Sequence, residues 1–233
     1  MRVIIIRVTG AIINAAAIIA GGVLGLIFKG KISEKISETV TRAIGLCICV
    51  IGLSGALGGD IMLLVASLVL GSLTGELLDI DGRLNKLGAF LQKKLSRDSN
   101  SSFAEGFVTA TLLFCVGAMA VVGSIESGLS NDQSVIITKS ILDGTTSMVF
   151  ASSLGLGVLF SFAPVFIYQG LIEFFAGFLQ NLLTHELITQ ISAAGSVMIL
   201  GIGLNMTAKT KIKVANLLPG LIFAAGYYYV FLI

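Results

Sequence analysis

The chain has 233 residues, of which 55% are apolar and only 12% are charged. Since about a quarter of the residues of an average soluble domain are charged, this composition indicates an integral membrane protein. The net charge of +2 is too small to favour nucleic-acid binding. The single histidine, His185, excludes a histidine cluster for metal binding or proton relay. Cys47, Cys49 and Cys115 lie in apolar segments and are expected to be free thiols.

Several apolar runs approach the ~20 residues that a helix needs to cross a ~30 Å hydrocarbon layer. The strands of a membrane barrel would instead alternate in segments of about ten residues, so we predict an all-α, polytopic membrane protein. We expect one integral membrane domain, 1–233, with about eight transmembrane helices and a cytoplasmic loop at 79–102. The predicted spans are 3–28, 43–58, 61–78, 105–124, 137–161, 163–182, 187–206 and 215–232.

Lysine and arginine concentrate in three of the predicted loops, 29–42, 83–97 and 209–213. Even numbers of spans separate these loops, so all three can face the cytoplasm, with both termini outside. Segment 31–41 has apolar residues at helical spacing, which fits either a helix on the membrane surface or a solvated extension of the second span. The loop 79–102 is expected to contain an amphipathic helix.

Parts of the chain resemble one another in an ordered way. Ile13-Asn14-Ala15 in the first predicted span resembles Tyr168-Gln169-Gly170 in the sixth. Ile51-Gly52-Leu53-Ser54 in the second matches Ile202-Gly203-Leu204-Asn205 in the seventh. The matched spans are five apart and therefore cross the membrane in opposite directions, which predicts an inverted internal repeat.

The fifth predicted span contains the stretch KSILDGTTSMVFASS, residues 139–153. Its polar residues spread around most of a helix, so lipid is expected to contact only a narrow side of it. Lys139 and Asp143 are four residues apart, on one helical face, and are expected to pair. The pattern T-x-[ST]-x-x-F occurs here and in the fourth span, so we expect Thr109, Thr111, Thr145 and Ser147 to share one polar space.

The candidate substrate-binding residues are the polar side chains of these central spans and the amides of the repeat-related spans: Asn14, Thr109, Thr111, Lys139, Asp143, Thr145, Thr146, Ser147, Ser152, Ser153, Gln169 and Asn205. A structural ion pair and hydroxyls that join helices are the alternatives for this set. The neighbouring glycines are either breaks that expose backbone groups or close-packing positions: Gly144, Gly155, Gly157, Gly201 and Gly203.

The sequence contains no G-x-S-x-G, H-E-x-x-H or phosphate-loop motif, so we expect neither an enzyme nor a bound cofactor. The leading hypothesis is a membrane transporter or channel for a small polar solute or an inorganic ion. Hydroxyls, carbonyls and one carboxylate suit a hard cation, whereas Lys139 with Asp143 could hold a zwitterion. The alternative is a non-transporting scaffold or partner subunit. Beyond the lipid bilayer, a homo-oligomeric partner is left open.

Three stretches resemble the bacterial membrane family of domain of unknown function 554 (DUF554; YdfK/YqgA-like). They are EGFVTATLLFCVG at 105–117, the stretch at 139–153, and GIGLN at 201–205 together with IKVANLLP at 212–219. The resemblance covers essentially the whole chain and implies a multi-pass protein of the bacterial inner membrane, but it implies no substrate. Ala118 stands where we expect a proline after Cys-Val-Gly, so a softened break in the fourth span is expected.

The predicted topology can be checked by cysteine accessibility in intact cells. With the native cysteines replaced, a membrane-impermeant thiol reagent should label a cysteine at Ser130, in an expected external loop without Lys or Arg. The same reagent should spare a cysteine at Asp98, in the basic cytoplasmic loop. The reverse labelling pattern would contradict the orientation.

Overall fold

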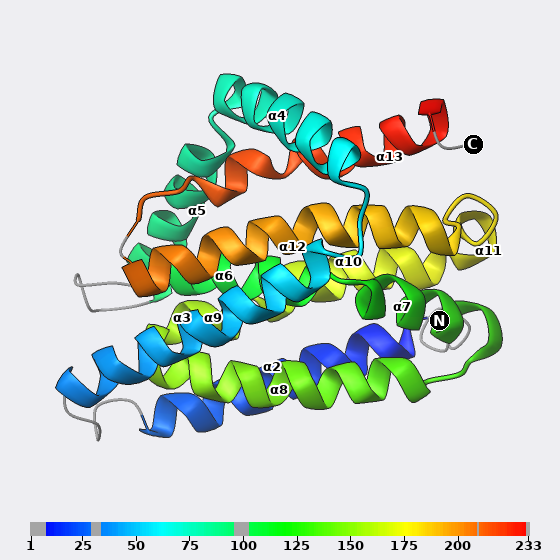
Figure 1. Ribbon diagram of the computed structural model, residues 1–233. Coiled ribbons are helices and arrows are strands. Elements are labelled where there is room, and N and C mark those ends of the chain that lie inside the picture. The colour runs from blue at the N-terminus through cyan, green and yellow to red at the C-terminus, as the bar shows by residue number, and fades with distance from the viewer. Residues whose placement is uncertain (1–7, 29–33, 96–102, 209, 232–233) are drawn as a thin grey trace. The chain divides into compact units, whose positions relative to one another are not determined.

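The computed structural model describes residues 8–28, 34–95, 103–208 and 210–231, and its regular elements are all helices (Figure 1). Six of the helices are long and apolar enough to cross a membrane, or seven if one bent pair forms a single span. The expected all-α, polytopic architecture is therefore confirmed. Contacts divide the chain into two compact units: unit 1, Met1–Ser33 with Gly88–Thr184, and unit 2, Glu34–Leu87 with His185–Ile233.

Unit 1 takes one helix from the start of the chain and the rest from its middle. Its helices are α2 (Thr9–Phe28), α6 (Phe103–Cys115), α7 (Ala118–Ser130), α8 (Ser134–Leu154), α9 (Leu156–Phe160), α10 (Phe162–Phe174) and α11 (Ala176–Leu179). Helix α2 packs along α8 and also contacts α10. Successive contacts of α2 climb α8 in the same direction, from Gly10 on Ile136 to Gly25 on Ala151, so these two helices are parallel.

Unit 2 pairs helices from the two ends of the chain. The helices from its first part are α3 (Glu34–Ala56) and α4 (Ile61–Leu78), and those from its second part are α12 (His185–Ala208), η1 (Val214–Leu217) and α13 (Pro219–Phe231). Helix α3 lies along α12, and α4 lies along α13. Gly45 of α3 contacts Met206 and Gly55 contacts Ser196, so α3 and α12 are antiparallel.

Glycines bring the paired helices of unit 2 into backbone contact. A Cβ on Gly52 would lie 2.7 Å from the carbonyl oxygen of Ser196 and would also press on the backbone N of Leu200. A Cβ on Gly203 would lie 2.7 Å from the carbonyl oxygen of Gly45 and 2.7 Å from the N of Cys49. Small residues at such positions are the usual means of close packing in membranes. Because α12 is one helix from His185 to Ala208, Gly203 is a packing position and not a break.

The expected fifth span differs most from the structure. Helix α8 has 21 residues, long enough to cross a bilayer, but it is not among the six apolar spans. Its buried side includes Lys139, Ser140, Asp143 and Ser147. The sequence predicts eight spans, whereas six or seven apolar spans are found among the described residues. The difference arises because α8 turns polar side chains toward neighbouring helices instead of presenting an apolar surface.

The chain reverses after α8 at Gly155, earlier than residue 162, which separates the predicted spans 137–161 and 163–182. Gly155 has φ 83° and ψ −152°, a conformation that is essentially restricted to glycine. The residues after it form α9 and α10, which together supply the apolar span Leu156–Phe174. Pro164 falls in the first turn of α10, where a missing N–H is tolerated. Gly144, also a predicted breaker, lies inside the continuous α8.

Helices α6 and α7 form the bent pair, with an angle of 61° between them. The break is at Gly117, whose φ of 131° strongly favours glycine. The alanine at position 118 therefore does not remove the break in the expected fourth span. Segment 34–41 belongs to the continuous α3, which supports the extension over a separate surface helix. The amphipathic helix expected in 79–102 is present as α5 (Ile80–Leu95).

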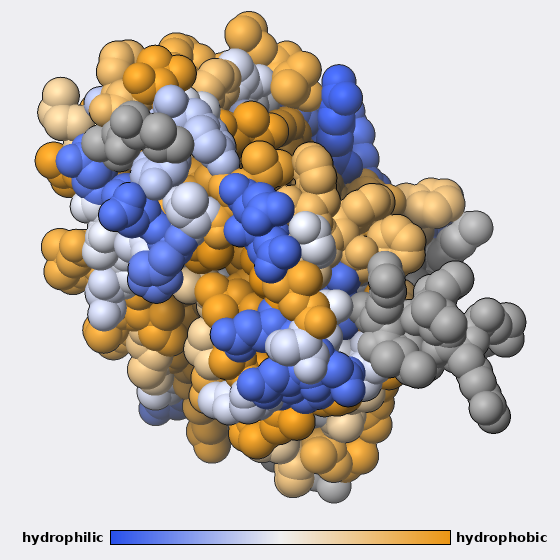
Figure 2. Space-filling model, turned by 90° about the vertical axis from the view of Figure 1, so that its right-hand side faces the viewer, coloured by the Kyte–Doolittle hydropathy of each residue, from blue (hydrophilic) through white to orange (hydrophobic). Residues whose placement is uncertain are grey.

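Both units expose large apolar side chains along their helices, as proteins in contact with lipid do. Figure 2 shows broad hydrophobic surfaces on the face it views, with hydrophilic residues in smaller groups. On α4, for example, Val65, Val69 and Leu73 are each more than half exposed. Residues 3–7 and 232 of the predicted spans and residues 96–102 of the predicted loop lie outside the described residues.

The glycines of α2 predict where added volume will destabilise unit 1. A methyl group on Gly21 would collide with the backbone carbonyl of Gly144, so Gly21→Ala should lower the free energy of unfolding by about 1–3 kcal/mol. Gly177→Ala in α11 is the control, because a Cβ there meets nothing within 4 Å. Equal stability of the two variants in detergent unfolding experiments would contradict the close contact.

Candidate functional site

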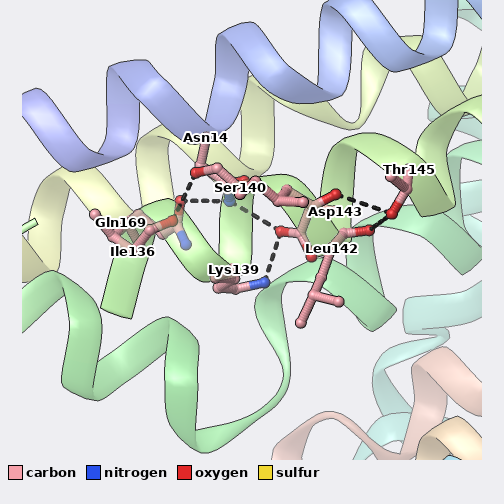
Figure 3. A network of polar contacts seen from close by, with 9 residues as sticks. Asn14, Ile136, Lys139, Ser140, Leu142, Asp143, Thr145 and Gln169 are labelled. Atoms are coloured by element: carbon pink, nitrogen blue, oxygen red, sulfur yellow. Dashed lines mark hydrogen bonds and ion pairs between the residues drawn. The ribbon is translucent and has the colours of Figure 1, made fainter. Parts of the chain in front are cut away.

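A buried polar network joins three helices of unit 1 (Figure 3). On α8, Lys139 Nζ donates to Asp143 Oδ2 at 2.6 Å. On α2, Asn14 Nδ2 donates to the same carboxylate oxygen at 2.9 Å and to Gln169 Oε1 of α10 at 2.9 Å. Asn14 and Gln169 are fully buried, and Lys139 and Asp143 are 6% and 7% exposed. Four residues that the sequence identifies as candidates thus meet in one place.

The carboxylate of Asp143 determines how both amides are oriented. An ionised carboxylate only accepts hydrogen bonds, so Asn14 must turn its NH₂ group toward Asp143. The same NH₂ group faces Gln169, which must then present its carbonyl oxygen. Two atoms remain without a hydrogen-bond partner within the described residues, the acceptor Asn14 Oδ1 and the donor Gln169 Nε2.

The ion pair is a demanding arrangement in an apolar setting. A single charge at the centre of a membrane helix costs at least about 3 kcal/mol, so neither partner can be buried there alone. Removing one member of a buried pair typically costs about 3–5 kcal/mol because the other charge stays behind. The amide of Asn14 shares in the solvation of Asp143. Lys139 and Asp143 therefore balance each other, and the ligand-binding capacity that remains lies in the amides.

Further buried polar atoms of unit 1 have no hydrogen-bond partner among the described residues. Buried polar atoms in proteins nearly always have hydrogen-bond partners, so a group of exceptions indicates a bound molecule, an ion or water. Among the described residues the side-chain atoms without partners all belong to unit 1: Asn14 Oδ1, Thr111 Oγ1, Ser124 Oγ, Gln169 Nε2, Glu173 Oε1 and Glu173 Oε2. They come from α2, α6, α7 and α10.

The other predicted hydroxyls of α8 do not join this network. Ser147 is buried but donates to the carbonyl oxygen of Ile18, which fastens α8 to α2. Thr145 is exposed and donates back to the carbonyls of Ile141 and Leu142. Ser152 likewise donates to the carbonyl of Val149. Hydrogen bonds of this kind are common for Ser and Thr in membrane helices and point to structure.

The remaining candidate residues either lie on α6 and α8 of unit 1 or belong to unit 2. Thr109 is buried on α6, and Thr146 and Ser153 are half-buried on α8. Asn205 belongs to unit 2, where its Oδ1 accepts from Thr210 Oγ1 at 2.7 Å and from the N of Ile212 at 2.9 Å. Its amide holds the segment after α12 within unit 2.

Sequence reasoning missed Glu173 and Ser127. Glu173, at the end of α10, is 1% exposed, and Ser127 of α7 is 2% exposed. The signal for Glu173 was available, since an acidic residue inside a predicted apolar span marks a functional site by default. Ser127 gave no such signal, because a serine near the end of a helix is ordinary.

The fold and the buried network define the class of this molecule, a multi-pass helical membrane protein with a polar core in one of its units. The chain belongs to the family described as "Protein of unknown function (DUF554)", which matches residues 9–229. This finding confirms the resemblance seen in the three sequence stretches.

Two bacterial proteins illustrate the relationship. The chain is 34% identical over 219 residues to "Uncharacterized membrane protein YdfK" of Bacillus subtilis (strain 168), covering 91% of this chain and 92% of that protein. It is 31% identical over 222 residues to "Uncharacterized protein YqgA" of Escherichia coli (strain K12), covering 93% and 94%. No solved structure matches the chain.

The ion pair leads to a test by charge exchange. Lys139→Ala and Asp143→Asn should each lower the free energy of unfolding by about 3–5 kcal/mol, because each leaves a buried charge unpaired. The double variant Lys139→Asp, Asp143→Lys restores the pair, and both amides can turn over so that Asn14 accepts and Gln169 donates. Unfolding in detergent should therefore show partial recovery. A double variant less stable than either single variant would contradict the pair as a main stabilising contact.

Proposed function

We propose that the protein is a transporter or channel for a small polar solute and not an enzyme, with the solute held beside Asn14 and Gln169 in unit 1. The observation that carries the proposal is the pair of buried amide atoms without partners, one acceptor and one donor. In a membrane protein such atoms are costly unless something binds them. A site of this kind between helices is where membrane transporters hold their substrates.

The chemistry of the free atoms favours a solute that has both a hydrogen-bond donor and an acceptor. Asn14 Oδ1 would accept from the solute, and Gln169 Nε2 would donate to it. The charges of Lys139 and Asp143 already neutralise each other at 2.6 Å, so the site offers no uncompensated charge to a solute at this position. A neutral polar or zwitterionic molecule therefore fits better here than a simple ion.

We further propose that the chain contains an inverted repeat, with a local two-fold relation within each unit. Gly52 contacts Ser196 and Leu200. Gly203, its partner in the predicted repeat, contacts Gly45 and Cys49. Cys49 and Leu200, and likewise Gly45 and Ser196, have the same separation in sequence as Gly52 and Gly203. The residues that one glycine contacts are therefore the repeat equivalents of the residues that the other contacts. Asn14 and Gln169 are matched in the first and sixth predicted spans and bond to each other, as residues beside a two-fold axis would. Inverted repeats around a polar site support alternating access.

The solute can be sought with purified protein in detergent by thermal unfolding against a panel of amino acids, amides, polyols and inorganic salts. A ligand of the site should raise the unfolding temperature of the wild type. It should have little effect on Gln169→Met, which keeps the side-chain length but removes both amide atoms. Gln190→Met is the matched control, because Gln190 accepts from the N of Asp60 in unit 2. This control should keep the ligand response.

A compound found in this way should then be taken up by liposomes that contain the wild type, and Asp143→Asn should abolish uptake while the protein remains reconstituted. Binding without uptake, or no binding by any compound, would favour a non-transporting scaffold or partner subunit. An equal response of Gln169→Met and the wild type would place the solute elsewhere.

A further inference from the structure

A second group of unsatisfied polar atoms lies one helical turn from the amides. Glu173 follows Gln169 by four residues on α10, and Gly10 precedes Asn14 by four residues on α2. The two helices touch at both levels: Asn14 bonds to Gln169, and a Cβ on Gly10 would lie 2.6 Å from Glu173 Oε1. Because Gly10 has no side chain, the carboxylate can reach the first turn of α2.

The carboxylate of Glu173 is buried and has no full countercharge among the described residues. Its residue is 1% exposed, and neither oxygen has a hydrogen-bond partner within the described part of the chain. The nearest donors, the backbone N–H groups of Gly10 and Ala11, approach it without well-aligned hydrogen bonds. A helix N-terminus supplies only about half an elementary charge, which leaves the carboxylate under-compensated. Lys139 is already engaged with Asp143.

The Ser127 hydroxyl also lies beside this carboxylate. Its oxygen lies near the carboxylate, since a Cβ on Gly10 would be 2.9 Å from Ser127 Oγ. Ser127 Oγ donates its hydrogen to Gln133 Oε1 at 3.0 Å. Gln133 Nε2 in turn donates to Asn131 Oδ1 at 3.2 Å, which sets the orientation of that amide. The Ser127 hydroxyl therefore lies between Gln133 and Glu173 and brings a further oxygen to the carboxylate.

We propose that Glu173 and Ser127 form a binding site for one monovalent positive charge, a proton or an alkali cation, at the end of unit 1 where α2 and α8 begin. One buried carboxylate without a countercharge in the described part of the chain calls for a single positive charge. The neighbouring ligand atoms are oxygens, which suit both a proton and a hard cation. No group of three or more acidic, cysteine or histidine side chains that could hold a divalent metal occurs among the residues described.

A series of hydrogen bonds also links this site to the surface. The hydrogen-bonded series runs from Asn131, which is exposed, through the half-buried Gln133 to the buried Ser127. These residues belong to the end of α7 and the turn before α8. A charge that reaches Glu173 from the side of the turn at 131–133 would lie one helical turn from the amide pair.

The other titratable groups near α10 are few. Helix α2 carries none, α11 carries none, α6 carries Glu105 and Cys115, and α7 carries Glu126. The charged groups of α8, which packs on α2 and α7, are the paired Lys139 and Asp143. Helix α10 itself carries Tyr168 besides Glu173. A cation response that disappears on replacing Glu173 alone can therefore be assigned to this carboxylate.

The test measures the thermal unfolding of purified protein in nanodiscs, in choline chloride and in the chlorides of lithium, sodium and potassium, from mildly acidic to alkaline pH. If the occupant is an alkali cation, one of these salts raises the unfolding temperature above that in choline at alkaline pH. If it is a proton, acidification does so in choline alone. Glu173→Gln, which is neutral and similar in shape, should lose the response, whereas Glu126→Gln on α7 should keep it.

Ser127→Ala serves as a second variant that leaves the carboxylate in place. Loss of one oxygen ligand should raise the half-saturating concentration of the cation, or of protons if the occupant is a proton, about tenfold. The inference is overturned if the wild type responds to neither cations nor pH, or if Glu173→Gln responds as the wild type does. If Glu173→Gln does not fold, Ser127→Ala decides the question. The inference is then overturned if Ser127→Ala responds at the same concentration as the wild type.

This inference rests on the proposed function only for its role as a companion to solute binding, and the two can fail separately. If no solute binds to the wild type but the cation response depends on Glu173, the solute proposal fails and the cation site stands. If a solute binds through Gln169 and no cation or pH response depends on Glu173, the cation site fails and the solute proposal stands.

Discussion

The parallel packing of α2 on α8 is the constraint on which unit 1 depends. Helix α8 carries a lysine and an aspartate that lipid would not accept, so it needs a neighbour that approaches closely and offers polar atoms. Glycines on α2 allow the approach, because Gly21 and Gly25 lie against the backbone carbonyls of Gly144 and Met148. Asn14 then reaches Asp143, and the contacts to α10 follow from the same amide.

Much of this site could be predicted from spacing alone, because an i, i+4 pair shares one helical face in any context. Lys139 and Asp143 pair as expected. The faces of α8 could not be assigned in the same way, because Thr145, with Ile141 and Leu142, is exposed although polar residues surround the helix. A hydroxyl can satisfy itself on its own backbone, so its polarity does not reveal which neighbour it faces.

The fold shows the same division between local and tertiary information. The long apolar helices were predictable from composition, since their length follows from the bilayer. The predicted spans 137–161 and 163–182 put the reversal close to Pro164, yet the chain turns at Gly155, where φ is 83°. A proline is compatible with the first turn of a helix, whereas this backbone conformation requires glycine, so the stronger constraint determines the turn. The sequence contains many glycines, and it does not reveal which of them adopts this backbone conformation.

The arrangement of charge explains why the proposed solute site and the proposed cation site can occur so close together. The ion pair is internally balanced, so it fixes the amides without attracting or repelling a charged neighbour. Glu173 lies one turn away on the same face of α10 and meets the same helix, α2. Both sites therefore join α2 to α10, one through hydrogen bonds and the other through a charge that must be neutralised. A change in the charge at Glu173 acts directly on the helix pair that holds Asn14 and Gln169, so occupancy of one site can alter the affinity of the other.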